Sequence, residues 1–564
     1  MLHLIPQPKR LIEKNTFLTK KTILADLTNT DQRLKKQICK LPLDENGIPF
    51  YIEYGTGERE GYTLSVNDTE ITLTADGIRG AFYGIQTLRQ IFAHEDIPVC
   101  EIEDEPDLGY RGFYHDVTRG KIPTLETLKW LVDQMAYCKL NSLQLYVEHT
   151  YEFKEYAEVT ARTGCLTAAE IRELDAYCKE NFIDFIPSLA TFGHLYELLE
   201  LPQYKHLTEI ENHVVDQIFW KDRMEHHTID PTNPESFSLV KSLIDQYMPL
   251  FSSEWFNICC DETFDLKNGR HKDEDTGKLY VDFAKKIIEY VRSCGKKVMM
   301  WGDILHQHPE RISEIPEDVL LLHWDYGANP DIDRAARFAK MNRTQIVCPG
   351  TRTWPYFCED ITNALSNIAQ MADAAYKFGA RGLLNTNWGD YGNTCSLSLT
   401  MCGIFFGAAK SWNISTKQES FLHDFEVLVY GFEGGSAHLW ELSEIETKIS
   451  FMQLCRRYSN HLYEKQLECL QPTPETIRSA HTRCLSLMDA LTAETWREDS
   501  YREALLLAAE AVLVMTEIYA NITGTEVTKH SNVETWLKKY RTAWLSQNKE
   551  PELCEIEKLF RFYA

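Results

Sequence analysis

The spacing of hydrophobic residues changes twice along this chain and divides it into three parts. In the first part, "GYTLSVNDTEITLTADG" (61–77) alternates apolar and polar residues on both sides of an Asn-Asp turn, which predicts two strands. The next stretch, "GIRGAFYGIQTLRQIFAH" (77–94), has apolar residues at helical spacing. Residues 1–108 are therefore expected to form a small α+β domain, with an amphipathic helix whose apolar positions include Ala81, Ile85, Leu88 and Ile91.

Residues 109–414 alternate short apolar runs with amphipathic helices. Eight strands separated by helices over about 300 residues predict an α/β fold, a (β/α)8 TIM barrel. A doubly wound open sheet is the alternative, and the count of eight and the polar or aromatic residues at most strand ends favour the barrel. The eight runs are 112–117, 142–148, 184–189, 255–260, 297–302, 319–324, 345–349 and 382–388.

The third part, residues 415–564, is helical in pattern throughout, as in "REALLLAAEAVLVMTEIYANI" (502–522). We expect a C-terminal helical region packed on the barrel. Its role is left open between closing the site, forming a homodimer and buttressing the barrel.

Composition narrows the classes of partner. Hydrophobic residues make up 44% and aromatic residues 12% of the 564 residues, enough for sizeable cores. The formal net charge of −25 argues against nucleic acid or an anionic membrane as the main partner. No stretch approaches the ~20 apolar residues of a membrane helix. The start lacks a signal-peptide pattern and the sixteen cysteines are scattered without C-x-x-C pairs, so reduced thiols and a cytoplasmic location are expected.

Polar and aromatic residues gather where the predicted strands end. Reacting groups of a (β/α)8 enzyme sit at the carboxyl ends of its strands. Indole faces stack on pyranose rings and carboxylates accept hydrogen bonds from hydroxyls, so this mixture predicts a sugar site. For each single tryptophan, core packing is the alternative. The residues are Asp116, Arg119, Glu148, His149, His194, Asp261, Glu262, Trp301, Asp303, Trp324, Asp325, Trp388 and Asp390.

Two adjacent carboxylates, Asp261 and Glu262, follow the apolar run in "WFNICCDETF" (255–264). Most glycosidases place two carboxyl groups on opposite sides of the scissile bond, whereas neighbours in a strand point to opposite faces unless the strand ends there. The pair suits substrate-assisted hydrolysis, in which one group protonates the leaving oxygen and the other orients a 2-acetamido nucleophile of the sugar. A polar loop after a strand is the alternative.

Several motifs together resemble glycoside hydrolase family 20, the β-N-acetylhexosaminidases. "LIPQPKRL" (4–11) and "GAFYGIQTLRQI" (80–91) resemble the N-terminal domain of that family, and residues 102–148 resemble its first barrel unit. "ATFGHLYELLELPQYKHLTE" (190–209) is most similar to the mostly intracellular hexosaminidase D-like branch, and "FNICCDET" (256–263) matches the Asp-Glu motif in its core. The resemblance covers residues 1–412.

This resemblance implies an exo-acting retaining enzyme that removes terminal β-linked N-acetylhexosamine, GlcNAc or GalNAc, from oligosaccharides or glycoconjugates through an oxazolinium intermediate, without a cofactor. Glu262 would be the general acid and Asp261 would hold the acetamido N–H. Arg111 would bind sugar hydroxyls, or else form a surface ion pair with Asp107 or Asp116. The other positions implied are Trp388 and Asp390 in the pocket floor, Trp301 and Trp324 as walls, and His194 and Glu148 beside the acid, with a structural role as the alternative for His194.

The sequence departs from the family at three places. The tyrosine expected to donate to the acetamido carbonyl is assigned to Tyr356, with Trp354, which sits nearer to the expected position, and Tyr391 as rivals. Cys259 and Cys260 replace the glycines before the Asp-Glu pair. Ala190 stands where other branches have an acid, so support for the histidine would come from elsewhere, such as Glu148.

Two other functions remain open at this stage. One is a glycosidase of different sugar preference, a β-glucosaminidase or an enzyme for modified N-acetylglucosamine, although a free amine cannot attack as an acetamide does. The other is a catalytically silent sugar-binding barrel, which the intact Asp-Glu pair disfavours. "RMEHHTID" (223–230) holds adjacent histidines, which are poor co-ligands, so no metal is expected.

Overall fold

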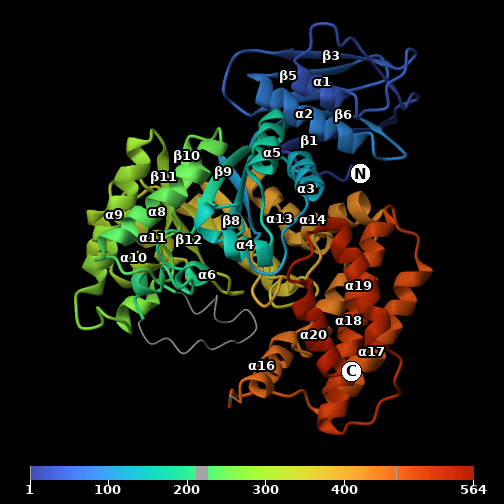
Figure 1. The fold of residues 1–564 in the computed structure, drawn as a ribbon. Coiled ribbons are helices and arrows are strands. Elements are labelled where there is room, and N and C mark those ends of the chain that lie inside the picture. Colours follow the sequence, from blue (N-terminus) through green and yellow to red (C-terminus); the bar gives the residue numbers. More distant parts are fainter. Residues whose placement is uncertain (1, 211–226, 465) are drawn as a thin grey trace.

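The computed structural model describes residues 2–210, 227–464 and 466–564. Three parts follow one another along the chain: an N-terminal sheet domain, a central barrel and a C-terminal group of helices (Figure 1). This arrangement confirms the fold class expected from the sequence. The metal-site motif examined above lies partly outside the described residues, which resume at His227.

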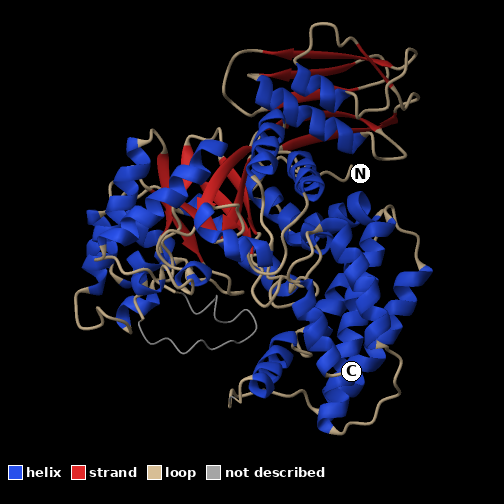
Figure 2. Ribbon diagram, in the orientation of Figure 1, coloured by secondary structure: helices blue, strands red, loops and turns tan. Residues whose placement is uncertain are grey.

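The N-terminal domain is a six-stranded mixed sheet with helices on one face (Figure 2). The alternating segments form the antiparallel pair β4 and β5, as expected, and the helix α2 buries its four predicted apolar positions completely. The strand order is β1-β6-β4-β5-β3-β2. The elements are β1 (Arg10–Phe17), β2 (Ile23–Ala25), α1 (Gln32–Ile38), β3 (Ile48–Tyr54), β4 (Tyr62–Val66), β5 (Ile71–Ala75), α2 (Ile78–Ile91) and β6 (Pro98–Asp104).

Eight parallel strands close the central barrel, because the first strand, β7, pairs both with β8 and with the last strand, β14. This closure excludes the open-sheet alternative, and each of the eight predicted apolar runs overlaps one strand, the first beginning two residues too late. The fourth strand, β10, is only three residues long and ends well before the acidic pair. The strands are β7 (Tyr110–Asp116), β8 (Ser142–Val147), β9 (Asp184–Leu189), β10 (Trp255–Asn257), β11 (Lys297–Trp301), β12 (Leu320–Trp324), β13 (Gln345–Cys348) and β14 (Gly382–Asn387).

Helices surround the barrel on the outside and present their apolar faces to the strands (Figure 1). Five of those named below begin at side-chain caps that the sequence supplies, among them Thr124 before α3 and the Thr167–Glu170 capping box around the start of α5. The barrel helices are α3 (Leu125–Tyr137), α4 (Ala157–Thr163), α5 (Ala168–Glu180), α6 (Tyr196–Leu199), α8 (Pro234–Tyr247), α9 (Thr276–Ser293), α10 (Asp303–Gln307), α11 (Asp333–Lys340), α12 (Ile361–Lys377) and α13 (Met401–Trp412).

The C-terminal part is helical, as expected. Its long helix α18 passes a length and hydropathy test for a membrane span, contrary to our reading of the sequence, but 72% of the apolar window is buried inside the protein. A core helix of a folded domain gives the same signal. The helices are α14 (Gln418–Phe425), α15 (Ser436–Glu446), α16 (Phe451–Leu462), α17 (Pro474–Ala493), α18 (Asp499–Thr523), α19 (Val533–Gln547) and α20 (Leu553–Phe562).

A buried polar cluster joins the N-terminal sheet to the amino end of the barrel. Asp104, at the end of β6, accepts hydrogen bonds from Lys139 Nζ at 2.9 Å, the Tyr62 hydroxyl at 2.7 Å and Trp412 Nε1 at 2.9 Å. Buried charges need such partners, since an unpaired one is costly. The cluster fixes the N-terminal domain on the barrel end opposite to the catalytic candidates.

Candidate active site

Side chains from seven of the eight strand ends converge at the carboxyl end of the barrel. Carboxylates, an arginine and a histidine form one connected group, and aromatic rings lie beside it. This is the end at which enzymes with this fold place their reacting groups. The residues, in strand order from β7, are Asp116 and Arg119, Glu148, His194, Asp261 and Glu262, Asp303, Tyr326, and finally Trp388 and Asp390.

A turn in unusual backbone conformation brings the two adjacent carboxylates to the same side. After β10 ends at Asn257, Cys259, Cys260 and Glu262 adopt φ values of +54°, +64° and +50°. Non-glycine residues are uncommon in this left-handed region, and such strain clusters at functional sites. Both cysteines are buried, and both occupy a backbone conformation that favours glycine. An extended strand would have turned Asp261 and Glu262 to opposite faces.

Both carboxylates contact the imidazole ring of His194. Its Nε2 lies 3.3 Å from Asp261 Oδ2 and 3.4 Å from Glu262 Oε2. Burial lowers the pKa of His194, but the negative charge of Asp261 and contacts to both carboxylates outweigh it and raise the pKa to about 10. The imidazole is thus a cation at neutral pH. Asp261 is the more enclosed of the pair, with 9% of its side chain exposed against 26% for Glu262.

Arg119 connects three further strand ends behind the histidine. Its guanidinium lies 2.9 Å from Asp116 Oδ2, 3.1 Å from Glu148 Oε1 and 3.3 Å from Asp390 Oδ1. Burial raises the pKa of Glu148 and raises that of Asp390 to about 6, although the charge of Arg119 opposes both shifts. Glu148 Oε1 also lies 3.8 Å from His194 Nδ1, near the histidine but beyond hydrogen-bond distance, so its support of the histidine stays a prediction.

Asp303 underlies the acidic pair from the next strand end. Its Oδ2 accepts a hydrogen bond from the backbone N–H of Glu262 at 3.0 Å. Burial, together with the negative charge of Asp261, raises the pKa of Asp303 to about 8. Asp303 therefore holds a proton at neutral pH and fixes the backbone at Glu262.

Aromatic rings form the other side of the site. Trp388 is 8% exposed, its Nε1 donates to the Tyr326 hydroxyl at 2.8 Å, and its ring centroid lies 6.1 Å from that of Trp301. Trp324 stacks on Tyr326 at 5.1 Å, and Trp354 meets Tyr326 edge-on at 5.4 Å. Trp301 is fully buried. The four predicted tryptophans thus belong to one aromatic group around Tyr326.

Arg111 is not in this site, and the prediction that it binds sugar is wrong. It lies near the start of β7, at the other end of the barrel, where its side chain is 0% exposed and its Nη1 donates to Glu60 at 2.7 Å. The remaining donors bind the carbonyls of Lys139 and Leu108 and the Tyr83 hydroxyl. Its ion pair is therefore buried and joins two domains, unlike the surface pairs considered above.

Two of the three candidates for the acetamido contact have their described partners outside the acidic pair. Burial raises the pKa of the Tyr356 phenol, and the charges that act on it most are those of Arg352, Asp360 and Glu446. Tyr391, beside Asp390, contacts Arg456 of α16. Trp354 meets Tyr326 edge-on, which places it beside the aromatic group.

Sequence reasoning missed Tyr326 and underrated Arg119 and Asp303. Tyr326 follows the predicted strand end Trp324–Asp325, and that position was its available signal. Arg119 and Asp303 stood among the strand-end residues, but the resemblance directed attention to Arg111. A strand end predicts location well and contact partners poorly, because the intervening loops decide which side chain turns inward.

Two groups of side chains in the described ranges have ligand atoms close enough to share a metal ion: His194, Asp261 and Glu262, and Glu209, Asp230 and His271. In the first, His194 Nε2 lies 3.3 Å from Asp261 Oδ2 and 3.4 Å from Glu262 Oε2, so the imidazole and the two carboxylates are one another's partners. In the second, His271 Nδ1 lies 2.9 Å from Glu209 Oε2, so these two groups satisfy each other. Ion pairing accounts for both groups.

Comparison with known proteins agrees with this geometry. The model of "Glycosyl hydrolase family 20, catalytic domain" matches residues 108–369, and that of "Glycosyl hydrolase family 20, domain 2" matches residues 2–105. The chain belongs to glycoside hydrolase family 20. The two matches cover the N-terminal domain and most of the barrel.

Relatives within this family are distant. A β-hexosaminidase of Porphyromonas gingivalis is 26% identical over 58% of this chain and 45% of its own length, and hexosaminidase D of Bos taurus is 25% identical over 36% and 59%. The chain thus spans about half the length of the curated relatives it matches. A solved structure of Flavobacterium johnsoniae chitobiase is 18% identical, with a TM-score of 0.62 over 100% of this chain and 99% of that one. This family 20 chain therefore shares its fold, C-terminal helices included, with a solved structure.

Proposed function

We propose that this family 20 protein is an exo-acting, retaining β-N-acetylhexosaminidase that works by substrate-assisted catalysis. The observation that carries the proposal is the left-handed turn that directs Asp261 and Glu262 into one site against His194. Two carboxylates this close cannot stand on opposite faces of a glycosidic bond. The nucleophile then has to come from the substrate, which requires a 2-acetamido sugar.

Glu262 is the proton donor in this proposal. Its side chain is the more exposed of the pair, at 26%, so it can reach a leaving group that enters from solvent. Its backbone N–H donates to Asp303 Oδ2, which fixes the main chain at this residue. Positioned general acids of this kind contribute rate factors of about 10²–10⁴.

Asp261 is the group that orients the acetamide. It is largely enclosed, and its Oδ2 lies 3.3 Å from His194 Nε2. A carboxylate accepts hydrogen bonds only, so it binds the acetamido N–H and turns the carbonyl oxygen towards the anomeric carbon. The positive charge that develops on the oxazolinium ring is stabilised by the same carboxylate.

The proposed reaction balances in two steps. The acetamido carbonyl oxygen forms a bond to C1 while the glycosidic C–O bond breaks and the proton of Glu262 passes to the leaving oxygen. Water then attacks C1 of the oxazolinium and gives its proton to Glu262, which restores the amide and the acid. Two inversions at C1 retain the β configuration. The ring face rests on Trp388, with Asp390 available to a sugar hydroxyl.

A panel of nitrophenyl β-glycosides tests this function. We expect turnover of β-GlcNAc, β-GalNAc or both, and competitive inhibition by a thiazoline that mimics the oxazoline. The β-GlcN and β-Glc compounds lack the acetamide and should turn over at least 10²-fold more slowly. Comparable turnover of β-Glc, or indifference to the thiazoline, would contradict substrate assistance. Binding of sugars without turnover would indicate the silent barrel.

We also propose that the protein works in a reducing, cytoplasmic compartment. All sixteen cysteines are unpaired in the structure and eleven of them are buried, which supports this location. Titration of thiols in protein purified without reductant and then denatured should give sixteen per chain. Consistently fewer would indicate disulfides and argue for an oxidising compartment.

A further inference from the structure

A hollow whose lining includes neither Asp261 nor Glu262 lies between the C-terminal helices and loops of the barrel. Its volume is ≈ 860 Å³, within the range of about 300–1,000 Å³ that small-molecule sites occupy. Helices α17, α18 and α19 form one side, and the loops after β7 and β14 contribute Lys121 and residues 394–399. These are the loops that also hold Arg119 and Asp390.

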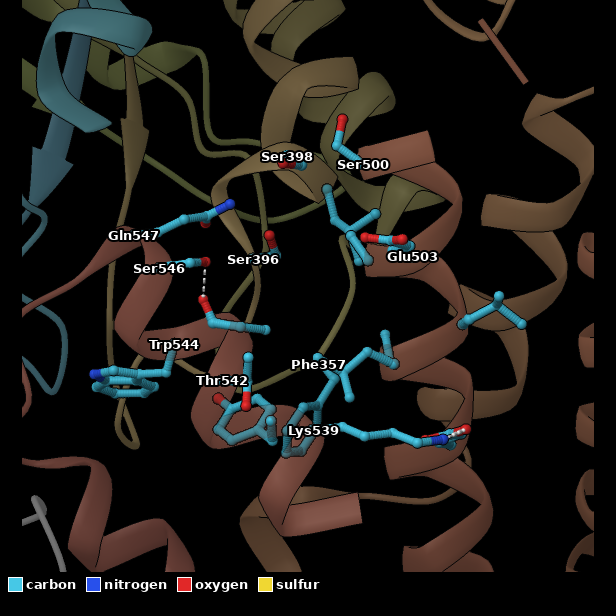
Figure 3. Close-up of a pocket in the computed structure, with 18 of the residues that line it drawn as sticks. Phe357, Ser396, Ser398, Ser500, Glu503, Lys539, Thr542, Trp544, Ser546 and Gln547 are labelled. Atoms are coloured by element: carbon cyan, nitrogen blue, oxygen red, sulfur yellow. Dashed lines mark hydrogen bonds and ion pairs between the residues drawn. The ribbon is translucent and has the colours of Figure 1, made fainter. Parts of the chain in front are cut away.

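The lining combines aromatic surface with uncharged polar groups. Phe357, Tyr540 and Trp544 supply aromatic surface, and the Ser396, Ser546 and Gln547 side chains lie around the same space (Figure 3). A polyhydroxylated ring needs both kinds of surface, an aromatic face for its C–H groups and hydroxyl or amide partners for its hydroxyls.

One hydroxyl in the lining has no partner within the protein. Ser398 is 8% exposed, and its hydroxyl, which reaches solvent, makes no hydrogen bond to the part of the protein that the structure describes. A hydroxyl that is open at the wall of a hollow can donate to or accept from a ligand or water. The Gln547 amide likewise has no side-chain hydrogen bond within the described ranges, although it is half-buried.

Charge excludes an anionic occupant. The lining has three carboxylates and two lysines, a net charge of −1. Lys539 is paired with Glu510, and the Lys121 ammonium lies against the Trp544 ring and donates to the carbonyls of residues 394 and 395. Neither lysine is therefore free to neutralise a phosphate or sulfate, and a neutral ligand fits better.

We propose that this hollow is a second, non-catalytic site that binds a neutral saccharide. The hollow and the catalytic centre share two loops, because Lys121 lies two residues beyond Arg119 and its hydrogen bonds join the β7 loop to the β14 loop, which also carries Asp390. The proposal rests on the proposed function only in the choice of an N-acetylglucosamine oligomer as probe.

Binding stoichiometry tests the second site without hydrolysis. In the Glu262→Gln background, saturated with the thiazoline to block the catalytic site, calorimetric titration with chitotriose should still show one binding event per chain. Absence of that event would overturn the proposal. Inorganic phosphate should not bind there, and phosphate binding stronger than that of chitotriose would overturn the choice of ligand.

A pair of substitutions on α19 localises the event. Ala543 is exposed and lines the hollow, so Ala543→Trp fills it without disturbing the core, while Leu545→Trp changes an exposed side chain on the same helix outside the lining. Ala543→Trp should weaken binding at least ten-fold and Leu545→Trp should leave it unchanged, with equal melting temperatures confirming that both fold. Equal binding by the two variants would place the site elsewhere.

A second variant and a separate assay keep the two proposals apart. Gln547→Leu preserves size and removes the amide, and should weaken chitotriose binding several-fold. Both Ala543→Trp and Gln547→Leu should hydrolyse small nitrophenyl substrates at the normal rate. If the nitrophenyl panel shows no hexosaminidase activity but the stoichiometry holds, the proposed function fails and the second site stands. The reverse result removes only the second site.

Discussion

Two buried arginines near the two ends of one strand have different roles. Arg111 and Arg119 lie eight residues apart at opposite ends of β7, are 0% and 4% exposed, and both pair with carboxylates. The hydrogen bonds of Arg111 go to Glu60 and to main-chain and phenol oxygens of a domain junction. Arg119 instead connects carboxylates from several strand ends. Burial and ion pairing alone therefore do not distinguish an arginine that stabilises the fold from one that organises a site. What distinguishes them is the end of the barrel at which each one lies.

The strongest contrast between the two ends is expected for their glutamates. Glu262→Gln removes the proposed proton donor and should lower kcat on chitobiose by about 10³-fold, within the range for a general acid. Glu60→Gln, at the Arg111 end, removes a charge of the same kind and should leave kcat unchanged. Steady-state kinetics of both variants measures this. Normal turnover of chitobiose by Glu262→Gln would refute the assignment of the acid.

The arginines themselves give the next largest effect. Lysine keeps the charge but loses the planar fork that holds several partners at once. Arg119→Lys should lower kcat/KM by about 10–100-fold, because Glu148 and Asp390 lose their common partner. Arg111→Lys should instead lower the melting temperature by about 3–6 °C at unchanged kcat/KM. If Arg111→Lys lost activity while it was fully folded, Arg111 would have a role in the active site after all.

The same contrast shows which features of the structure can be predicted from the sequence. Hydrophobic periodicity was enough for the eight strands and the three-part order, because apolar runs between amphipathic helices fit few architectures. The acidic pair could be identified because two adjacent carboxylates after a buried run repel each other, and such a repulsion suggests a functional role. What could not be read was loop conformation. The positive φ of Cys259 and Cys260, the inward turn of Tyr326 and the distance of Arg111 from the site depend on tertiary contacts that no local pattern encodes.

The free energy of unfolding should depend on pH through His194 at the carboxyl end of the barrel, but not through Arg111 at the amino end. Its pKa is raised from the ordinary 6.5 to about 10, so the folded state holds a proton that the unfolded chain releases earlier. The stabilisation is therefore complete below pH 6.5 and is lost progressively as pH rises towards 10. Urea midpoints of the wild type should fall across this window, and those of His194→Gln should fall less. Because Arg111 does not titrate there, Arg111→Lys should keep the wild-type slope. Parallel curves for His194→Gln and the wild type would contradict the ion pair with Asp261.

The smallest effect should come from two tryptophans that each donate one hydrogen bond. Trp388 Nε1 donates to Tyr326 at the carboxyl end, and Trp412 Nε1 donates to Asp104 at the amino end. Phenylalanine keeps an aromatic face and removes the donor, at a cost of about 1 kcal/mol for each bond. In Trp388→Phe that cost falls on substrate binding, because Tyr326 and the pocket floor loosen, and KM should rise about five-fold. In Trp412→Phe the same cost falls on folding and lowers the urea midpoint at unchanged KM. If both variants changed stability and neither changed KM, Trp388 would be a packing residue. The aromatic side of the substrate site would then not include it.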